Sequence, residues 1–437
     1  MSTPAVVPKK LILPFILITF LFALWGFAND ITNPMVAAFK RVLELNNFQA
    51  SLVQLAFYGG YFTMALPAAL FIKKYSYKKG IIIGLLLYAV GSLFFYPAAY
   101  NESFGFFLLA LYILTFGLAF LETTANPYIL SMGPEATATQ RLNLAQAFNP
   151  MGALAGLFIA KRYILERLQS NELAEGGSYL YYTLNESEKS VVRTHDLMII
   201  RDPYVLLGIF VIFIIILIYL TKMPESKDTN HFSISNSIGN LYKIQHFREG
   251  VIAQMFYVGA QIMCWTYIYQ YAEALGISND SAVNYGYAAL IFFLAGRWIC
   301  TFLLRFTHAG RLLLIFSIMA IISTICTIFI YGIIGLYALV STSFFMSLMF
   351  PTIYGIALKG LGNDTKIGAA FLVMAIVGGA ILPTLQGLIM DLGGSGYDDI
   401  LILGVPEVNF SFILPLFCFL IVALYSYRVI NIHLIKE

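Results

Sequence analysis

Charged residues are scarce in this sequence. Asp, Glu, Lys and Arg together make up 11% of its 437 residues, against about 25% in soluble globular domains. Hydrophobic residues account for 59%, and the mean hydropathy is +0.80. This composition excludes an ordinary soluble domain and indicates an integral membrane protein. Because backbone polar groups inside lipid must be satisfied within their own segment, the spans are expected to be helices.

Cysteines are few, and several catalytic motifs are missing. The four cysteines lie in apolar segments without the paired spacing of a metal site, so we expect small buried hydrophobic residues and no metal. The sequence has no G-x-x-x-x-G-K-[ST] loop, no H-E-x-x-H and no G-x-S-x-G. These absences argue against an ATPase and a membrane protease, and the net charge of +3 gives no case for a nucleic-acid partner. We therefore expect no enzyme and no cofactor.

Twelve apolar segments are long enough to span a bilayer. They run over residues 11–39, 50–72, 80–99, 104–130, 141–161, 203–222, 248–272, 283–305, 311–331, 335–358, 366–389 and 408–430. A polar stretch separates the sixth from the seventh, and a second one, 161–202, separates the fifth from the sixth. The sequence predicts an all-α membrane protein with a six-helix bundle at 1–222, a cytoplasmic linker at 223–247 and a second six-helix bundle at 248–437.

The charges of the short loops indicate the orientation. The loop after the second span holds four lysines and no acid: Lys73, Lys74, Lys78 and Lys79. The loop after the eleventh span holds four acids: Asp391, Asp398, Asp399 and Glu407. Lys and Arg are enriched on the cytoplasmic side, so we place the first loop inside, the second outside, and both termini in the cytoplasm.

Two carboxylates lie where the bilayer centre is expected. Asp30 lies in the first span, between Asn29 and Asn33, and Glu122 lies in the fourth, four residues before Asn126 on the same helix face. A charge at such depth costs about 2.5–3.5 kcal/mol on insertion scales, so each is a functional candidate. A structural hydrogen-bonding role between packed helices remains the alternative.

Amides and aromatic residues follow on other spans. In the fifth, Asn143, Gln146 and Asn149 recur every third residue and Pro150 follows. Amides both donate and accept hydrogen bonds, which suits hydroxyl groups.

The seventh span carries a second polar face, formed by Gln254, Tyr257, Gln261 and Trp265. Amides with a flat aromatic match the rim and the ring face of a sugar. An interfacial aromatic belt is the alternative reading. Arg297, a cation in the middle of the eighth span, has no role that the sequence assigns.

Five motifs together resemble the fucose permease branch of the major facilitator superfamily, over nearly all twelve spans. They are "FQASLVQLAFYGGYF", "LETTANPYIL", "RLNLAQAFNPMGA", "VIAQMFYVGAQIMCW" and "FPTIYGIALKGLG". The resemblance implies the major facilitator fold, alternating access, and import of L-fucose with a proton in a bacterial inner membrane. It places the central protonatable site on Glu122, and it points to Gln146 and Asn149 at the sugar or the cavity.

The first span departs from the family pattern W-x-x-x-N-N-x-N-D. Eight residues after Trp25 the chain has Asn33, and its acid, Asp30, occupies the position of an Asn. Asp30 can be a second protonatable or sugar-binding group, or it can join Asn33 in a Na⁺ site.

The expected mechanism makes Glu122 the switch. Once Glu122 is protonated, a sugar held by the amides of the fifth span and the residues of the seventh would close the outer gate. We expect the protein to act as a monomer with a monosaccharide substrate. A Na⁺-coupled or facilitative galactose/glucose carrier and a non-transporting sugar sensor are the rival hypotheses.

Overall fold

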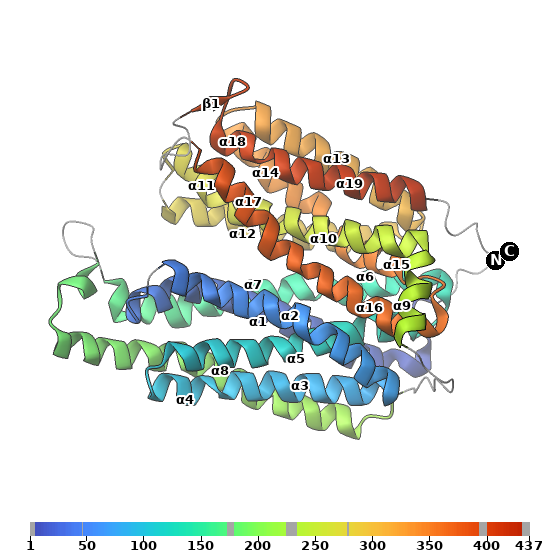
Figure 1. Ribbon diagram of the computed structural model, residues 1–437, viewed down its shortest axis with the longest axis horizontal. Helices are drawn as coiled ribbons and strands as arrows, with labels where there is room; N and C mark the ends of the chain where they lie inside the picture. Colours follow the sequence, from blue (N-terminus) through green and yellow to red (C-terminus); the bar gives the residue numbers. More distant parts are fainter. Residues whose placement is uncertain are drawn as a thin grey trace. The chain divides into compact units, whose positions relative to one another are not determined.

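The protein forms two compact units of helices, seen in a computed structural model (Figure 1). The structure describes residues 5–45, 47–172, 179–223, 234–277, 279–392 and 400–430. Unit 1 comprises Met1–Phe15, Asn126–Pro150 and Asp228–Glu437, and unit 2 comprises Ile16–Ala125 and Met151–Lys227. The predicted division at the 223–247 linker is a different one, and it stays a prediction.

Unit 2 is built mainly from long helices of the first half of the chain. They are α1 (Ile12–Val42), α2 (Asn47–Lys74), α3 (Tyr77–Leu93), α4 (Phe95–Tyr100), α5 (Phe104–Ser131), α7 (Asn149–Ile159) and α8 (Glu186–Leu220). The first residues of α1 and α7 and the last residues of α5 belong to unit 1.

Unit 1 contains the remaining helices and a short antiparallel pair of strands. They are α6 (Ala138–Gln146), α9 (Ile234–Lys243), α10 (Gln245–Thr266), α11 (Ile268–Ala274), α12 (Asn279–Leu303), α13 (Ala309–Phe329), α14 (Ile333–Met346), α15 (Met349–Ala357), α16 (Thr365–Met374), α17 (Gly378–Met390), β1 (Leu401–Ile402), β2 (Val405–Pro406), α18 (Glu407–Ser411) and α19 (Ile413–Val429). The hydrophobic core of unit 1 packs around α10.

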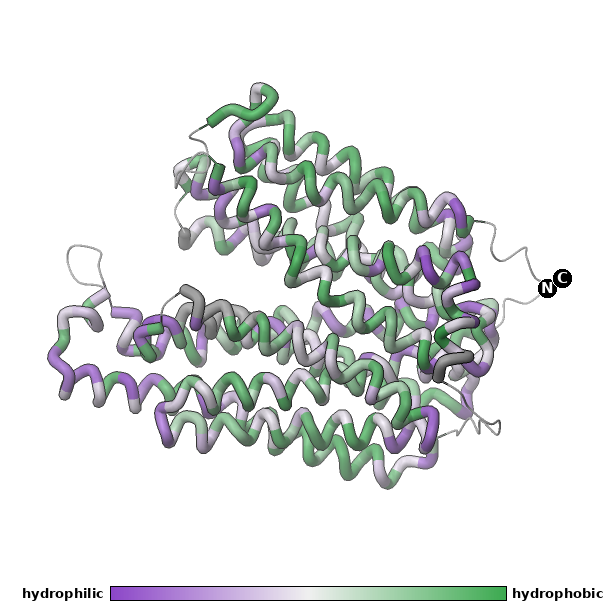
Figure 2. Tube along the Cα trace, in the orientation of Figure 1, coloured by the Kyte–Doolittle hydropathy of each residue, from purple (hydrophilic) through white to green (hydrophobic). Residues whose placement is uncertain are grey.

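The long helices have the length and composition of membrane spans. Within the described ranges, eleven helical segments are long and apolar enough to cross a bilayer. Figure 2 shows hydrophobic residues along these helices and hydrophilic ones concentrated near their ends. Eleven of the twelve predicted spans therefore match such a segment, although several segments consist of two successive helices, as α14 and α15 do.

The fifth predicted span is broken in its middle. α6 ends at Gln146 and α7 begins at Asn149. At the break, the Phe148 N–H bonds to the Ala145 carbonyl at 3.3 Å, a tighter turn than an α-helix makes. Pro150 has no N–H to continue the helical ladder, so the break follows from the sequence at this point.

The sixth span begins earlier than predicted. α8 starts at Glu186, where Asn185 accepts the N–H of Glu188 and the Glu188 side chain accepts the N–H of Asn185. This capping box supplies a strong helix start well before the apolar run at 203. The first turns of α8 thus belong to the polar stretch that the sequence placed between spans.

Glycines let two helices of unit 2 approach closely. A Cβ on Gly152 of α7 would lie 1.8 Å from the Ala23 carbonyl oxygen of α1, and one on Gly156 would lie 2.6 Å from that of Phe27. A larger residue at either position would force the backbones apart. This contact fixes the helix that carries Asp30.

Candidate functional site

Asp30 lies in the part of α1 that α7 packs against. Its side chain is 9% exposed, and the Asn29 amide donates a hydrogen bond of 3.4 Å to its Oδ2. The side chain of Asn33 lies outside the described residues. A carboxyl at this depth with one long hydrogen bond is poorly compensated as an anion, which fits a group that takes up a proton.

Glu122 is half-buried on α5 and belongs to the same unit. Two tyrosines of α2 interact electrostatically with the two carboxyl groups. Tyr58 interacts with Asp30, and Tyr61 interacts with both Glu122 and Tyr58. We call Asp30, Tyr58, Tyr61 and Glu122 the carboxylate cluster. Sequence reasoning missed the two tyrosines, although their spacing of three places them on one face of α2.

The predicted amides of the fourth and fifth spans meet in unit 1. The Gln146 Nε2 donates to the Asn126 Oδ1 at 2.8 Å. The Asn143 amide donates to the Thr139 carbonyl at 3.0 Å and to the Thr352 hydroxyl of α15 at 3.1 Å. The ladder predicted from spacing is therefore divided, because Asn143 joins α6 to α15 while Gln146 turns to α5.

Asn149 lies beyond the helix break and begins α7, where it is half-buried. The same break gives Gln146 a second role. Pro150 cannot bond to the Gln146 carbonyl four residues earlier, and this carbonyl accepts a hydrogen bond of 3.2 Å from the Nη1 of Arg297. The same Nη1 lies 3.4 Å from the Gln146 Oε1. Pro150 thus leaves the Gln146 carbonyl able to accept a hydrogen bond from the buried guanidinium of Arg297.

Arg297 connects the amides to the aromatic residues of α10. Its guanidinium carbon lies 4.9 Å from the centre of the Phe293 ring, one turn earlier on α12. The Phe293 and Trp265 rings meet edge to face at 5.0 Å, and the Trp265 Nε1 donates to the Ser343 hydroxyl at 3.2 Å. We call Asn126, Gln146, Arg297, Phe293 and Trp265 the amide–aromatic cluster.

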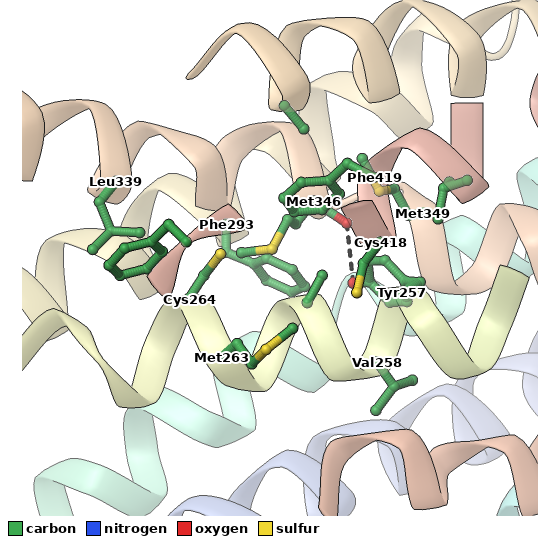
Figure 3. Close-up of a cluster of buried hydrophobic side chains, with 14 of the residues drawn as sticks. Tyr257, Val258, Met263, Cys264, Phe293, Leu339, Met346, Met349, Cys418 and Phe419 are labelled. Atoms are coloured by element: carbon green, nitrogen blue, oxygen red, sulfur yellow. Dashed lines mark hydrogen bonds between the residues drawn. The ribbon is translucent and has the colours of Figure 1, made fainter. Parts of the chain in front are cut away.

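The other predicted residues of α10 behave differently from one another. Tyr257 is fully buried, and its hydroxyl donates to the Met346 carbonyl at 3.1 Å, beside Cys418 (Figure 3). Gln261 is half-buried, as Trp265 is. Gln254 is buried, and neither end of its amide has a hydrogen-bond partner among the described residues. Tyr257 is therefore tied to the helix bundle, whereas Gln261 and Trp265 keep an accessible part.

The amide–aromatic cluster has the chemistry of a hydroxyl-binding site. Arg297 is 3% exposed, and its Nε has no hydrogen-bond partner among the described residues. A buried cation with an unused donor, an amide pair and an accessible indole offers donors, acceptors and a flat apolar face. The sequence singled out the amides and Trp265 but gave no role to Arg297 or Phe293.

Comparison with known proteins identifies the family of the chain. Residues 17–383 match the sequence profile of the Major Facilitator Superfamily. The chain is 55% identical to an L-fucose-proton symporter of Haemophilus influenzae over 97% of this chain and 98% of that protein. It is 35% identical to an L-fucose-proton symporter of Escherichia coli, over 96% of this chain and 93% of that protein.

A solved structure gives the same result. The crystal structure of a Major Facilitator Superfamily transporter, FucP, in the outward conformation superimposes with a TM-score of 0.86 at 34% identity, covering 96% of this chain and 99% of that one. The predicted fold is confirmed, and the relatives are transporters and not enzymes. The chain is a multi-pass membrane protein that belongs to the Major Facilitator Superfamily, in the branch of the L-fucose-proton symporters.

Proposed function

We propose that the protein imports L-fucose, or a closely related hexose, together with a proton by alternating access. Its strong similarity to L-fucose-proton symporters supports the substrate and the coupling ion. The observation that carries the proposal is the joining of Gln146 to Arg297 and, through Phe293, to Trp265. This set presents polar groups and an aromatic face together, as recognition of a sugar requires.

In this proposal the sugar site consists of amides and aromatic residues. Gln146 and Asn126 bind hydroxyl groups, with Asn143 and Asn149 framing the site, and Trp265 covers an apolar ring face. Gln261 adds an amide from α10, and Tyr257 orients that helix through its bond to Met346. Asn29 and Asn33 remain candidates beside Asp30. Arg297 positions Gln146 and offers its free Nε to a hydroxyl or to the ring oxygen.

Proton coupling is assigned to the carboxylate cluster. Glu122 is the switch, because its half-buried position on α5 leaves it open to proton exchange while limiting its hydration as an anion. Asp30 is its partner, connected through Tyr61 and Tyr58. Neutralising the carboxyls lowers the cost of the closed, loaded state, so that proton and sugar together permit the conformational change.

The proposal includes a placement in the cell. The bundles 1–222 and 248–437, with the linker 223–247 on the cytoplasmic side, form a monomeric transporter of a bacterial inner membrane with both termini inside. The lysine-rich loop at 73–79 supports this orientation. No cofactor is needed, since the proton gradient supplies the energy.

Uptake of radiolabelled L-fucose into vesicles tests the proposal. Vesicles containing the purified protein receive an imposed proton gradient or an imposed Na⁺ gradient, with unlabelled fucose, galactose and glucose as competitors. Accumulation above equilibrium under the proton gradient alone, blocked best by fucose, is expected.

Accumulation that requires Na⁺ would assign Asp30 to a Na⁺ site and would overturn the proposal of proton coupling. Equilibration without accumulation under either gradient would indicate a facilitative carrier. Sugar binding without any uptake would indicate a sensor.

A further inference from the structure

A cluster of lysines lies at one end of unit 2, where α2 ends and α3 begins. Lys74 is the last residue of α2, and Lys78 and Lys79 lie in the first turn of α3. Lys74 and Lys79 are exposed, whereas Lys78 is half-buried. A preference for lysines on the cytoplasmic side accounts for their number, but it does not account for the arrangement of their side chains around one aromatic ring.

The ring of Tyr75 lies close to two of these lysines. Tyr75 is 49% exposed, and its ring packs against the Phe71 ring at 4.6 Å, which in turn meets the Phe120 ring of α5 at 5.6 Å. The Lys74 Nζ lies 5.5 Å from the centre of the Tyr75 ring, and the Lys79 Nζ lies 5.4 Å from it. Two ammonium groups from different helices are therefore held near one ring, and packing fixes the position of that ring.

Lys78 joins this cluster to the end of α8. Its Nζ donates to the carbonyls of Tyr219 and Thr221, both at 2.8 Å, so the start of α3 and the end of α8 lie together (Figure 1). The side chains of Tyr219 and Leu220 are 69% and 72% exposed. Exposed aromatic and aliphatic side chains therefore lie at the same end of the unit as the lysines.

Lys74 and Lys79 have no acidic partner in the described part of the chain. Neither ammonium group pairs with a carboxylate there. α2 and α3 contain no acidic residue. The last acid of α8 is Asp202, which is roughly 27 Å along the helix from Leu220. The two ammonium groups therefore create a local positive potential that no neighbouring carboxylate neutralises.

The start of α3 also favours an anion. The Ser76 hydroxyl accepts the Lys79 N–H at 3.3 Å, and the first turn of α3 contains no acid. The first turn of a helix carries a partial positive charge, which anions stabilise and cations destabilise. Lys78 and Lys79 add their charges to that turn, so an anion bound beside it would relieve the repulsion.

The ends of the apolar segments indicate the depth of the cluster in the membrane. One segment ends at Lys74, the next begins at Tyr77, and a third ends at Leu220. Residues at the ends of membrane spans lie near the lipid headgroups, where tyrosines are also enriched. The lysine cluster is therefore expected at the level of the phospholipid phosphates.

We propose that Lys74, Lys79 and Tyr75 form a binding site for the phosphate of an anionic phospholipid. Lysine binds phosphate as a compact point charge, and basic clusters beside a membrane helix attract anionic lipids. The acyl chains of a lipid held at this site would cover Tyr219 and Leu220, which a soluble phosphate would leave exposed. This site does not depend on which sugar is transported.

Lipid binding to the full-length protein in detergent tests the site. Native mass spectrometry measures the affinity of the tightest site for phosphatidylglycerol, with phosphatidylcholine as a lipid without net charge. Lys74→Gln/Lys79→Gln should bind phosphatidylglycerol roughly 30-fold more weakly, because each lysine near an anionic membrane contributes a factor of about five. Lys74→Arg/Lys79→Arg keeps both charges and should bind as the wild type does.

A matched control removes the same charge elsewhere. Lys9→Gln/Lys10→Gln alters two exposed lysines of η1 (Lys9–Leu11) and should leave the affinity unchanged. Thermal unfolding supplies an independent readout, because a ligand that binds the folded protein stabilises it. Phosphatidylglycerol should raise the melting temperature of the wild type and of the control more than that of Lys74→Gln/Lys79→Gln.

Several results would overturn the proposal. Equal affinities of the wild type and Lys74→Gln/Lys79→Gln would place the lipid elsewhere on the protein. An equal loss in Lys9→Gln/Lys10→Gln would indicate attraction by net charge alone. Equally tight binding of phosphatidylcholine would show that the site does not recognise negative charge. Displacement of the lipid by inorganic phosphate at the same concentration would indicate a site for a soluble phosphate.

Discussion

Gln146 donates a 2.8 Å hydrogen bond to Asn126, and so ties the residue before the break in the fifth span to the fourth span. Both partners are buried amides. The side-chain amide oxygen and the backbone carbonyl of Gln146 both accept from the Nη1 of Arg297. Gln146 therefore links the Asn126 amide to the Arg297 guanidinium through hydrogen bonds.

Replacing Gln146 tests that junction. Gln146→Leu removes the donor to the Asn126 Oδ1 and the side-chain acceptor of the Arg297 Nη1. Such a loss costs about 1–3 kcal/mol, so the apparent affinity for fucose should fall roughly 5- to 150-fold. Equilibrium binding to the purified protein measures it. Gln140→Leu removes a neighbouring buried amide that bonds to the Thr301 carbonyl, and it should keep the affinity of the wild type. Equal losses in both variants would argue for general damage to α6.

Replacing Glu122 separates binding from coupling. Glu122→Gln cannot exchange a proton but keeps the shape of the side chain, so counterflow of fucose should continue while accumulation drops to the equilibrium level. Paired counterflow and gradient-driven uptake assays make the distinction. Glu135→Gln alters an exposed acid of η2 (Glu135–Thr137) and should behave as wild type. Proton-driven accumulation in Glu122→Gln would refute the switch.

Replacing Asp30 distinguishes between the two hypotheses for its role, a partner of Glu122 in proton coupling or a ligand in a cation site. If Asp30 partners Glu122, Asp30→Asn should lose most proton-driven accumulation, and added Na⁺ should change nothing in either protein. Tyr58→Phe, which keeps the ring beside Asp30, should retain the larger part of the activity. Uptake in wild type that rises with Na⁺, and no longer does so in Asp30→Asn, would instead assign Asp30 to a cation site.

The hydrogen bond between Asn143 and Thr352 is expected to hold α6 against α15. Thr352→Val removes it with little change in volume. Interhelical hydrogen bonds in membranes average about 0.6 kcal/mol, so the equilibrium between conformations should shift roughly threefold toward separation of these helices. Spin labels on α6 and α15 report the distance distribution. An unchanged distribution would mean that apolar packing alone holds this contact.

The stability of unit 2 should depend on Gly152. Gly152→Ala places a Cβ 1.8 Å from the Ala23 carbonyl oxygen, and overpacking of this kind costs about 1–3 kcal/mol. A lower melting temperature in detergent is expected. Gly239→Ala on α9 meets nothing within 4 Å and should be neutral or slightly stabilising, because alanine restricts the unfolded chain. Similar losses in the two variants would contradict the role of the close contact.

The sequence by itself determined the membrane class, nearly all the spans and the superfamily. Length and hydropathy fix a spanning helix, since the backbone must satisfy itself within each segment. The sequence also indicated the motif around Glu122 and the amides from Asn143 to Asn149, because polar residues are conspicuous in otherwise apolar helices. The apolar pattern predicts one continuous span over 141–161, whereas the structure divides it after Gln146, next to Pro150.

Only the tertiary structure decided which polar groups meet. Arg297 had no role in the sequence, because its hydrogen-bond acceptor belongs to another helix and is the backbone carbonyl of Gln146. Glu407 was assigned to an exposed loop, since loop charge is a local signal while its burial depends on α11, α13 and α17. Local composition determines where a helix can cross the membrane, and packing between helices determines which of its polar side chains are accessible, paired or left without a partner.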